Sequence, residues 1–316
     1  MFLKPMHKSP IVLLMGPTAV GKTDFAIALS QFFPIEIISV DSALVYRGMD
    51  IGTAKPSLLQ RAQVPHHLID IRDPIDSYSA AQFCDDVQQL IPEIIARGNF
   101  PLLVGGTMMY YQSLIRGLSP LPAANPTMRA ELEEEAKKLG WPALHARLEK
   151  IDPQTFARLH PNDAQRIQRA LEIYMITQKP LSAWLAEGNV IFPYEYHALA
   201  LAPPERDVLH QRIALRFSAM LKNGLIEEVQ QLMQNPDLNL NTPALRAVGY
   251  RQVWQGLEEE WPREEILERG IIATRQLAKR QLTWLRSWPA LTWFDSTTHD
   301  CLEQLRKSIS ILWERF

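Results

Sequence analysis

Cysteine is scarce in this sequence, with two among 316 residues, Cys84 and Cys301. They lie far apart, and neither belongs to a CxxC pair or a Cys/His cluster. Because disulfide-framed domains and structural zinc sites need several closely spaced cysteines, we expect neither here. The pattern suits a reducing compartment and predicts a cytoplasmic protein.

Long apolar runs are also missing. The longest one near the N-terminus, Ile11–Met15, has five residues and leads into a glycine-containing loop. This run is too short for a signal peptide or a membrane span, so we expect no association with a membrane.

An excess of either charge is absent as well, since 33 Lys and Arg stand against 35 Asp and Glu, giving a net charge of −2. This balance excludes a generally basic protein or a polybasic tail. It leaves room for a local basic face, because the charges are unevenly placed. Acidic residues gather in 131–135 and 258–260, and arginines gather in 165–169, 246–251 and 275–286.

What the sequence does contain is a series of short apolar runs of strand length, which do not alternate with polar residues: 11–15, 36–40, 67–71, 101–104 and 197–202. Such runs are typical of a parallel sheet that is buried on both faces. Helical patterns lie between them, for example Thr23–Phe33 and Ser79–Arg97, with Ser79 as a helix N-cap and Gly98 closing the helix. The rhythm predicts an α/β fold with a parallel sheet flanked by helices, and the GxxxxGK[ST] pattern at 16–23 makes the expected fold P-loop NTPase-like.

The alternation of strands and helices stops at a Pro-rich joint, 117–122. The residues that follow read as helices separated by prolines, so we expect an all-helical inserted domain over 123–196. The core would then consist of 1–122 and 197–316. Its C-terminal part is predicted to be helical, because apolar residues recur at three- and four-residue spacing at Ile213, Phe217, Met220 and Leu221.

A glycine-containing segment after the first apolar run matches the pattern GxxxxGK[ST]. It follows a predicted strand and precedes a predicted helix, which is the context that this phosphate-binding loop (P-loop) requires. Backbone N–H groups and the helix N-terminus would hold phosphate oxygens, Lys22 would neutralise them, and the Thr23 hydroxyl would ligate Mg²⁺. The loop comprises Gly16, Pro17, Thr18, Ala19, Val20, Gly21, Lys22 and Thr23.

The loop does not identify its ligand. A nucleoside triphosphate is the default expectation for this motif. A diphosphate leaving group would be held equally well, because the donors recognise oxygen atoms and not the rest of the molecule.

A carboxylate follows the second apolar run, where Asp41 would stand at the carboxyl end of a buried strand. Open α/β sheets bind ligands at that edge, so Asp41 is the first candidate for acid/base chemistry. The alternative is an aspartate that caps a turn through its side chain. Asp70, near the end of the third run, competes as a Walker-B-like partner of magnesium.

Five blocks give a more specific signal: GPTAVGKT (16–23), SVDSALVYRGMDIGTAKP (39–56), LLVGGTMMYYQSL (102–114), GLSPLP (117–122) and RAVGYRQVW (246–254). Together they resemble bacterial tRNA dimethylallyltransferase, the MiaA family. The resemblance extends from about residue 11 to about residue 294. Val20 stands where the family often has Ser, and Ala247 stands where some members have Cys.

The resemblance implies that a dimethylallyl group moves from dimethylallyl diphosphate to N6 of adenosine 37 in tRNA, with release of diphosphate. The P-loop would hold the leaving group, and Lys22 and a Mg²⁺ ion on Thr23 would stabilise its charge. Adenine N6 is a weak nucleophile, so a carboxylate that orients it and accepts its proton would assist the reaction. The resemblance assigns that role to Asp41.

Three further residues are candidates for contact with the substrates. Thr107 follows the fourth apolar run and could touch the nucleotide or the leaving group, or it could cap a helix. Arg216 aligns with an arginine that the family is thought to use on the diphosphate. Arg212, four residues earlier, could share its helix face, and for both arginines a solvated surface position is the alternative.

The resemblance also implies an RNA-binding surface. Tyr250 would stack on a base, and basic side chains would contact phosphates. The chain from 273 to 288 is rich in arginine and lysine, although a helix that packs its tryptophans inward and solvates its charges has the same pattern. The residues assigned to tRNA are Asp41, Ser42, Ala43, Leu44, Thr107, Arg129, Gln165, Arg166, Ile167, Gln168, Arg169, Arg246, Ala247, Val248, Gly249, Tyr250, Arg251, Arg275, Lys279 and Arg280.

Two other function classes share parts of this pattern. A P-loop kinase for a small molecule or nucleotide would use the same loop, with Asp41 contacting an acceptor hydroxyl. An NTP-driven RNA-binding module would use the basic segments without covalent chemistry. The leading expectation remains a monomeric enzyme that binds Mg²⁺, dimethylallyl diphosphate and the anticodon stem-loop of tRNA.

Overall fold

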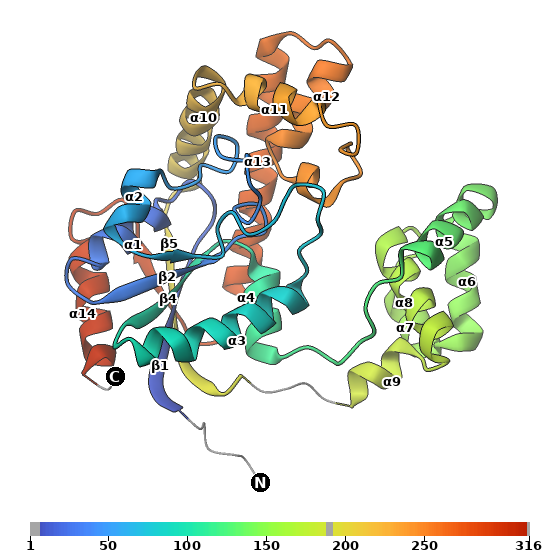
Figure 1. Ribbon diagram of the computed structural model, residues 1–316, viewed down its shortest axis with the longest axis horizontal. Coiled ribbons are helices and arrows are strands. Elements are labelled where there is room, and N and C mark those ends of the chain that lie inside the picture. Colours follow the sequence, from blue (N-terminus) through green and yellow to red (C-terminus); the bar gives the residue numbers. More distant parts are fainter. Residues whose placement is uncertain (1–6, 188–191, 315–316) are drawn as a thin grey trace. The chain divides into compact units, whose positions relative to one another are not determined.

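The computed structural model describes residues 7–187 and 192–314, and the chain forms two compact units. One unit consists of Met1–Gln112 together with Pro193–Phe316. The other is Ser113–Phe192, whose helices are drawn mainly in green in Figure 1.

Both boundaries of the helical unit differ from the expected insertion, 123–196, and therefore from the expected core segments, 1–122 and 197–316. They lie closer to the N-terminus, so the end of helix α4 (Met108–Arg116) and the Pro-rich joint belong to the helical unit. Residues 188–191 of the expected insertion lie outside the described residues.

The first unit is built on one six-stranded sheet with the strand order β3-β2-β4-β1-β5-β6. All paired strands are parallel, so their carboxyl ends meet at one edge of the sheet. The strands are β1 (His7–Met15), β2 (Ile35–Val40), β3 (His66–His67), β4 (Phe100–Gly105), β5 (Tyr194–Ala202) and β6 (Leu291–Asp295).

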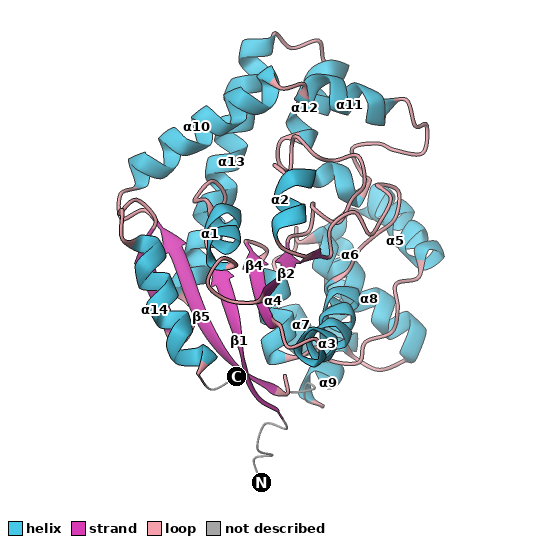
Figure 2. Ribbon diagram, turned by 60° about the vertical axis from the view of Figure 1, so that its left-hand side comes forward, coloured by secondary structure: helices cyan, strands magenta, loops and turns pink. Residues whose placement is uncertain are grey.

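Helices cover both faces of this sheet, which is why its central strands are mostly apolar; the exceptions in β2 are the buried residues Glu36 and Ser39. Every residue of β2 and β4 is buried or nearly so. One core cluster joins Val12 and Leu14 of β1 to helices α1 (Lys22–Leu29) and α14 (Cys301–Trp313). Helix α3 (Ala80–Ala96) and α4 lie on the opposite side in Figure 2. The predicted P-loop NTPase-like α/β fold is confirmed.

Two strands differ from the sequence-based expectation. The predicted strand 67–71 is wrong beyond His67, because Leu68 and Asp70 have left-handed backbone angles (φ of 62° and 58°) that end the extended chain. Strand β6 was not predicted. It is an edge strand with two exposed positions among its five residues, so it lacks a continuous buried run.

The predicted helix signals near the sheet are largely confirmed. Ser79 caps α3 by accepting a hydrogen bond from the Gln82 backbone N–H, and the Gln82 side chain accepts one from the Ser79 N–H, which completes a capping box. Gly98 follows with φ of 76°, the left-handed conformation that ends a helix. Helix α1 begins at Lys22 and ends at Leu29, four residues earlier than expected. The short helix α2 is Leu58–Gln63.

The C-terminal part of the first unit is mostly helical, as predicted. The four apolar residues singled out for their spacing, Ile213 among them, are all buried on one helix, α10. None of the helices in the described part of the chain is long and apolar enough to cross a membrane. The elements are α10 (Arg206–Lys222), α11 (Leu225–Met233), the 3₁₀ helix η1 (Pro243–Arg246), α12 (Tyr250–Glu258) and α13 (Arg263–Arg286).

The second unit has its own apolar core, formed by residues such as Leu132, Leu144 and Ile167. Several of its helices begin with proline in the first turn, where the missing N–H costs nothing. Its helices are α5 (Pro126–Leu139), α6 (Trp141–Ile151), α7 (Pro153–Arg158), α8 (Ala164–Thr177) and α9 (Leu181–Ala186).

A fully buried carboxylate, Glu172, stands in this helical unit. Arg129 donates two hydrogen bonds to it, and Arg169 and the Asn125 backbone N–H donate one each. Burial alone would raise the pKa of Glu172, but these donors outweigh it and the pKa lies below its usual value. The pairs therefore connect α5 and α8 within the unit.

We expect Glu172→Gln to lower the free energy of unfolding of the helical unit by about 2 kcal/mol, because Arg129 and Arg169 lose their charged partner. Both arginine side chains are partly exposed, so water limits the loss. The pKa of Glu172 is lower in the folded protein than its usual value of 4.5. The stabilisation by the ionised carboxylate is therefore complete above pH 4.5 and is lost as the pH falls below that value. Urea unfolding followed by circular dichroism measures the change. Glu131→Gln, at an exposed site on α5, is the control, and equal midpoints for the two variants would contradict the prediction.

Candidate functional site

The P-loop, residues 16–23, connects β1 to α1 at the carboxyl edge of the sheet. Gly21 is the N-cap of α1 and has φ of 87°, a conformation that favours glycine. A Cβ atom on Gly16 would lie 2.5 Å from the Leu201 carbonyl oxygen of β5, so only glycine fits there. The loop is therefore held close to the sheet, with its N–H groups at a helix N-terminus.

Lys22 folds back over this loop. Its Nζ donates hydrogen bonds to the carbonyl oxygens of Gly16 (3.0 Å) and Pro17 (2.8 Å). Burial and the nearby charge of Arg216 lower the pKa of Lys22 to about 7, while Asp41 acts in the opposite direction. Lys22 is thus a partly buried amine whose ammonium form has too little negative charge around it to keep its usual pKa.

Asp41 follows β2 at the same edge of the sheet. Its Oδ1 accepts hydrogen bonds from the backbone N–H groups of Ala43 (2.8 Å) and Leu44 (3.3 Å), so the turn-capping alternative is correct as a local description. Among the described residues, Oδ2 has no hydrogen-bond partner. One oxygen fixes the carboxylate, and the other remains available.

Arg216 on α10 belongs to the same group of charges. Burial lowers its pKa, and the carboxylates of Asp41 and Asp24 oppose that shift. Its guanidinium donates to the Thr53 carbonyl oxygen at 3.3 Å. The structure therefore brings together Lys22, Asp41 and Arg216, which are far apart in the sequence.

Arg212 lies one turn earlier on α10 but does not join this group. Its guanidinium donates to the hydroxyl and the carbonyl oxygen of Ser296, at 3.3 and 3.4 Å. Asp70 also has another role than expected. Its two carboxylate oxygens pair with Lys55 and with Arg61, so the structure does not support the Walker-B-like role.

Thr107 stands after β4 and faces the residues that follow β2. Its hydroxyl accepts a hydrogen bond from the Ser42 backbone N–H at 3.1 Å, and its own N–H donates to the Val40 carbonyl oxygen. No side-chain cap of α4 by Thr107 is found among the described hydrogen bonds. The residue therefore connects two strand ends beside Asp41.

Gln281 on α13 was missed by sequence reasoning. Its side chain is nearly buried and contacts the P-loop at Thr18 and the turn at Gly106. A signal was present, because Ala278 and Leu285, three residues before and four residues after it, are both buried. A polar residue on the apolar face of a helix usually has buried partners.

The loop after Asp41 is fixed by Glu228 and Tyr250, another arrangement that was not predicted. Glu228 accepts hydrogen bonds from the backbone N–H groups of residues 50–52 and from the Tyr250 hydroxyl. The Gly52 N–H also donates to the Tyr250 hydroxyl oxygen at 3.1 Å. Burial and Glu228 raise the pKa of Tyr250.

The expectation that Tyr250 stacks on a base is wrong, because its side chain is 0% exposed. A Cβ atom on Gly52 would lie 2.4 Å from the Tyr250 ring, which shows how tightly the loop packs on it.

We expect Tyr250→Phe to reduce the free energy of unfolding by about 1 kcal/mol, because it removes a buried hydroxyl that both donates and accepts. Urea denaturation measures this. Tyr196→Phe, whose hydroxyl has no partner among the described residues, should leave stability unchanged. Equal losses in the two variants would show that the hydroxyl of Tyr250 has no special role.

The candidate RNA residues of the helical unit divide into two groups. Gln165 and Arg166 are exposed at the start of α8. Ile167 is fully buried in the core of the unit, so its assignment to tRNA contact is wrong. Gln168 donates to the Arg129 carbonyl oxygen and to Glu133, and Arg129 and Arg169 are paired with Glu172.

The candidate RNA residues of the C-terminal part also divide into exposed and buried ones. Arg246 and Arg251 are exposed, Ala247 and Val248 are partly buried, and Gly249 is buried with φ of 98°.

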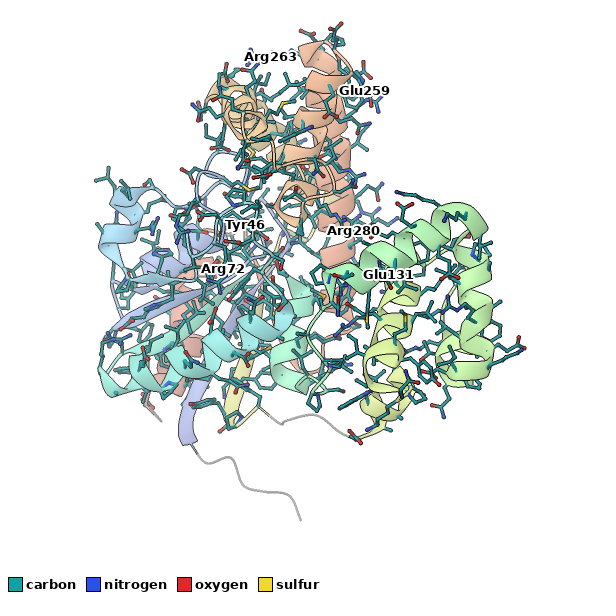
Figure 3. All side chains as sticks on the ribbon, turned by 45° about the vertical axis from the view of Figure 1, so that its right-hand side comes forward. Tyr46, Arg72, Glu131, Glu259, Arg263 and Arg280 are labelled. Atoms are coloured by element: carbon teal, nitrogen blue, oxygen red, sulfur yellow. The ribbon has the colours of Figure 1, made fainter. Side chains whose placement is uncertain are left out.

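On α13, Lys279 and Arg280 are exposed and Arg275 is half-buried; Figure 3 marks Arg280 on this helix. Trp288 is buried, whereas Trp284 is 38% exposed. Trp288, just after the end of the helix, therefore packs inward, and the helix itself presents cations to solvent.

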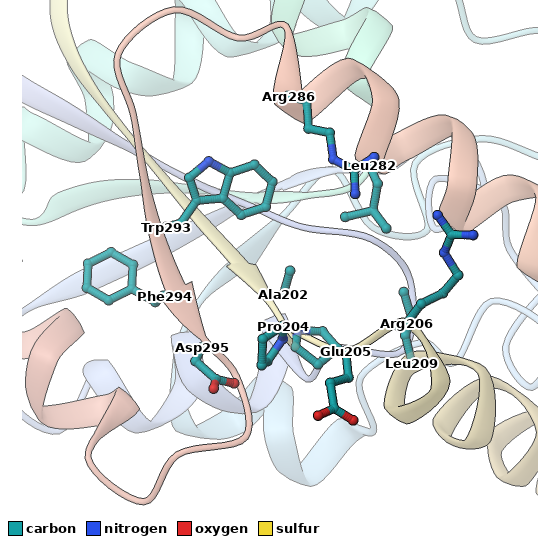
Figure 4. Close-up of a pocket in the computed structure, with 11 residues that line it drawn as sticks. Ala202, Pro204, Glu205, Arg206, Leu209, Leu282, Arg286, Trp293, Phe294 and Asp295 are labelled. Atoms are coloured by element: carbon teal, nitrogen blue, oxygen red, sulfur yellow. The ribbon is translucent and has the colours of Figure 1, made fainter.

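A pocket of about 480 Å³ lies at the carboxyl ends of β5 and β6 (Figure 4). It is formed by the start of α10, the C-terminal half of α13 and both strands. Because the strands are parallel, this pocket shares the sheet edge with the P-loop. Its lining includes Arg206, Leu209, Leu282, Arg286, Trp293 and Asp295.

A parallel sheet with a P-loop at its carboxyl edge defines a phosphate-binding α/β protein. The sequence model of a family described as IPP transferase matches residues 44–288. The chain belongs to this family, and the resemblance noted from its sequence blocks is confirmed.

Two curated relatives are similar over nearly their whole length. The tRNA dimethylallyltransferase 2 of Hahella chejuensis is 51% identical over 315 residues, covering 95% of each chain. The tRNA dimethylallyltransferase of Thiobacillus denitrificans is 56% identical over 293 residues, covering 93% of this chain and 92% of the relative.

Solved structures show the same fold. The tRNA isopentenylpyrophosphate transferase of Bacillus halodurans matches with a TM-score of 0.71 and 38% sequence identity. The match covers 97% of this chain and 98% of the Bacillus halodurans chain. A eukaryotic dimethylallyltransferase acting on tRNA matches with a TM-score of 0.82 and 28% sequence identity. The match covers 98% of this chain and 80% of the eukaryotic chain.

Proposed function

We propose that this protein is a tRNA dimethylallyltransferase that moves the dimethylallyl group of dimethylallyl diphosphate to N6 of adenosine 37 in tRNA. The observation that carries the proposal is the meeting of a P-loop, a partly buried lysine and arginine, and a carboxylate with one free oxygen at one sheet edge. The names of the curated relatives support the same activity.

The P-loop side of the site suits a diphosphate leaving group. As the bond between the dimethylallyl carbon and oxygen breaks, negative charge develops on the departing diphosphate. The loop N–H groups, the Lys22 ammonium and the Arg216 guanidinium stabilise that charge. Lys22 exchanges its contacts with the Gly16 and Pro17 carbonyls for phosphate oxygens.

Asp41 acts on the other reactant. The new bond forms between adenine N6 and the dimethylallyl carbon, and N6 must lose one proton. The free Oδ2 of Asp41 accepts that proton, while Oδ1 stays bonded to Ala43 and Leu44. Diphosphate leaves with the electron pair of the broken bond, so charge and atoms balance.

Magnesium belongs to the proposal as a partner of the diphosphate. The Thr23 hydroxyl makes no hydrogen bond to any described residue, so it is available as a ligand. No group of three His, Cys, Asp or Glu residues capable of holding a metal occurs in the described part of the chain. This fits Mg²⁺, which often keeps one or two protein ligands and takes the rest from phosphate and water. The ion would supply charge neutralisation on the leaving group.

The anticodon stem-loop of tRNA is the proposed macromolecular substrate. Adenosine 37 must leave its stack to reach Asp41. The residues beside Asp41 would contact it, namely Ser42, Ala43, Leu44 and Thr107. Exposed donors would hold the phosphate backbone, namely Gln165, Arg166, Arg246, Arg251, Lys279 and Arg280.

The test is incubation of the protein with labelled dimethylallyl diphosphate, Mg²⁺ and an unmodified anticodon stem-loop. The expected result is label on the adenosine next to the anticodon, and a stem-loop with guanosine at that position is the matched control. ATP consumption without label transfer would overturn the proposal in favour of the kinase or NTP-driven alternatives. None of the relatives named above is described as either.

The oligomeric state and the cellular compartment complete the proposal. We expect a monomer. We place the protein in the cytoplasm, which suits the two free, buried thiols of Cys84 and Cys301.

A further inference from the structure

One side chain joins the P-loop to the turn after β4. The Oε1 atom of Gln281 accepts a hydrogen bond from the Thr18 backbone N–H, and its Nε2 donates one to the Gly106 carbonyl oxygen. Both distances are 2.9 Å. The partners fix the orientation of the amide, since an N–H requires the oxygen and a carbonyl requires the NH₂ group.

The connection continues from Gly106 to Asp41. Thr107, the next residue, accepts a hydrogen bond from the Ser42 N–H, and Ser42 follows Asp41 directly. A continuous path of covalent and hydrogen bonds therefore runs from the P-loop through Gln281 to the carboxylate.

The Gln281 side chain is tightly packed between the P-loop and the turn at Gly106. A Cβ atom on Gly106 would lie 2.4 Å from Gln281 Nε2 and 3.2 Å from the Gly16 carbonyl oxygen. The amide of Gln281 thus fills the gap between the P-loop and the Gly106 turn, and its side chain is 9% exposed. A well-packed amide with both ends bonded holds its partners at a defined spacing.

We propose that Gln281 is a positioning residue that sets the separation between the diphosphate and the base that accepts the N6 proton. This rests on the proposed function, in which the P-loop holds the leaving group and Asp41 acts on the nucleophile. In a displacement, the breaking and forming bonds must be aligned, so the two loops must stay at a fixed distance. Gln281 touches neither reacting atom and acts through Thr18 and Gly106.

The position of Gln281 on α13 gives it a second connection. The same helix presents Lys279 and Arg280, which are exposed and proposed to bind the RNA backbone. A shift of α13 on RNA binding would move the amide between the loops.

The test compares Gln281→Met with wild type. Methionine keeps the length of the side chain but loses both polar contacts, so the loops are no longer tied. We expect kcat to fall by about 10²-fold, the effect of a misplacement of about 1 Å. The Kd values for inorganic pyrophosphate and for the stem-loop, each measured alone, should stay near wild type because their own contacts remain. Gln276→Met, at an exposed site on α13, is the matched control and should leave kcat unchanged.

A second variant keeps the proposal testable if Gln281→Met does not fold. Gln281→Glu retains the acceptor for Thr18 but turns a carboxylate oxygen toward the Gly106 carbonyl and places a negative charge beside the diphosphate. We expect kcat to fall and KM for dimethylallyl diphosphate to rise.

A wild-type kcat in either variant overturns the proposal. A loss of kcat that only follows a loss of Tm in both variants indicates a merely structural role and also overturns it. If wild-type protein transfers no label, the proposed function fails, which is a separate result.

Discussion

Asp41→Asn is expected to lower kcat for dimethylallyl transfer by about 10³-fold, within the usual range for removal of a general base. Asparagine keeps an oxygen that can accept from the Ala43 and Leu44 N–H groups, so the turn after β2 should persist. It cannot accept the N6 proton. The measurement is single-turnover label transfer at saturating concentrations of both substrates.

This substitution separates two roles that Asp41 could have. A residue that only orients N6 needs a hydrogen-bond acceptor, which asparagine could provide, and the rate would then fall little. A proton acceptor needs the carboxylate, and only Asp41→Asn tests that without breaking the turn. Asp85→Asn removes the same charge from an exposed position on α3 and should leave the rate unchanged. A rate near wild type for Asp41→Asn would remove it as the base.

The parts of the site that were predictable from sequence are those encoded locally. The P-loop carries its ligand groups on consecutive residues, and Asp41 directly follows a buried strand. Helix caps such as Ser79 are also local, because donor and acceptor lie three residues apart. For these features the spacing along the chain determines the spacing in space.

The parts that were not predictable depend on pairs that are distant in sequence. Gln281 meets Thr18 across 263 residues, and Glu228 meets Ile51 across 177. Neither partner has a motif, because one backbone N–H resembles another. Only the packing of α13 and α11 in the fold brings them together.

The errors on Tyr250 and Ile167 have a different cause. Each stands beside arginines in sequence, which suggested an RNA surface. Yet Tyr250 shares a helix face with the buried Val253 and Trp254, and Ile167 shares one with the buried Ala170. Sequence neighbours on a helix point in different directions, so residues three and four apart were the better guide.

Lys22→Met is expected to lower kcat by about 10²–10³-fold, the usual loss when a group that stabilises developing charge is removed. Methionine retains the apolar length of the side chain and loses the ammonium that sits against the Gly16 and Pro17 carbonyls. The Kd for inorganic pyrophosphate should rise as well. Titration calorimetry and single-turnover transfer measure the two effects.

The pH dependence of pyrophosphate binding tests the same lysine in the unmodified protein. Its pKa is about 7 in the free protein because burial and Arg216 disfavour the ammonium. A bound anion favours the ammonium and raises this pKa, so binding takes up a proton above pH 7. We therefore expect the Kd to be least sensitive to pH below about 7 and to rise with pH above it, by at most about tenfold per unit from this group.

Lys22→Arg is the matched control, because a guanidinium stays charged throughout this range. The titration of pyrophosphate itself contributes equally to both proteins, so the difference between their profiles reports Lys22. In Lys22→Arg, the Kd for pyrophosphate should lack the additional rise above pH 7 that Lys22 causes in the unmodified protein. Parallel profiles would show that Lys22 is already fully charged in the free protein, and that Asp41 compensates for burial and for Arg216 more strongly than the structure indicates.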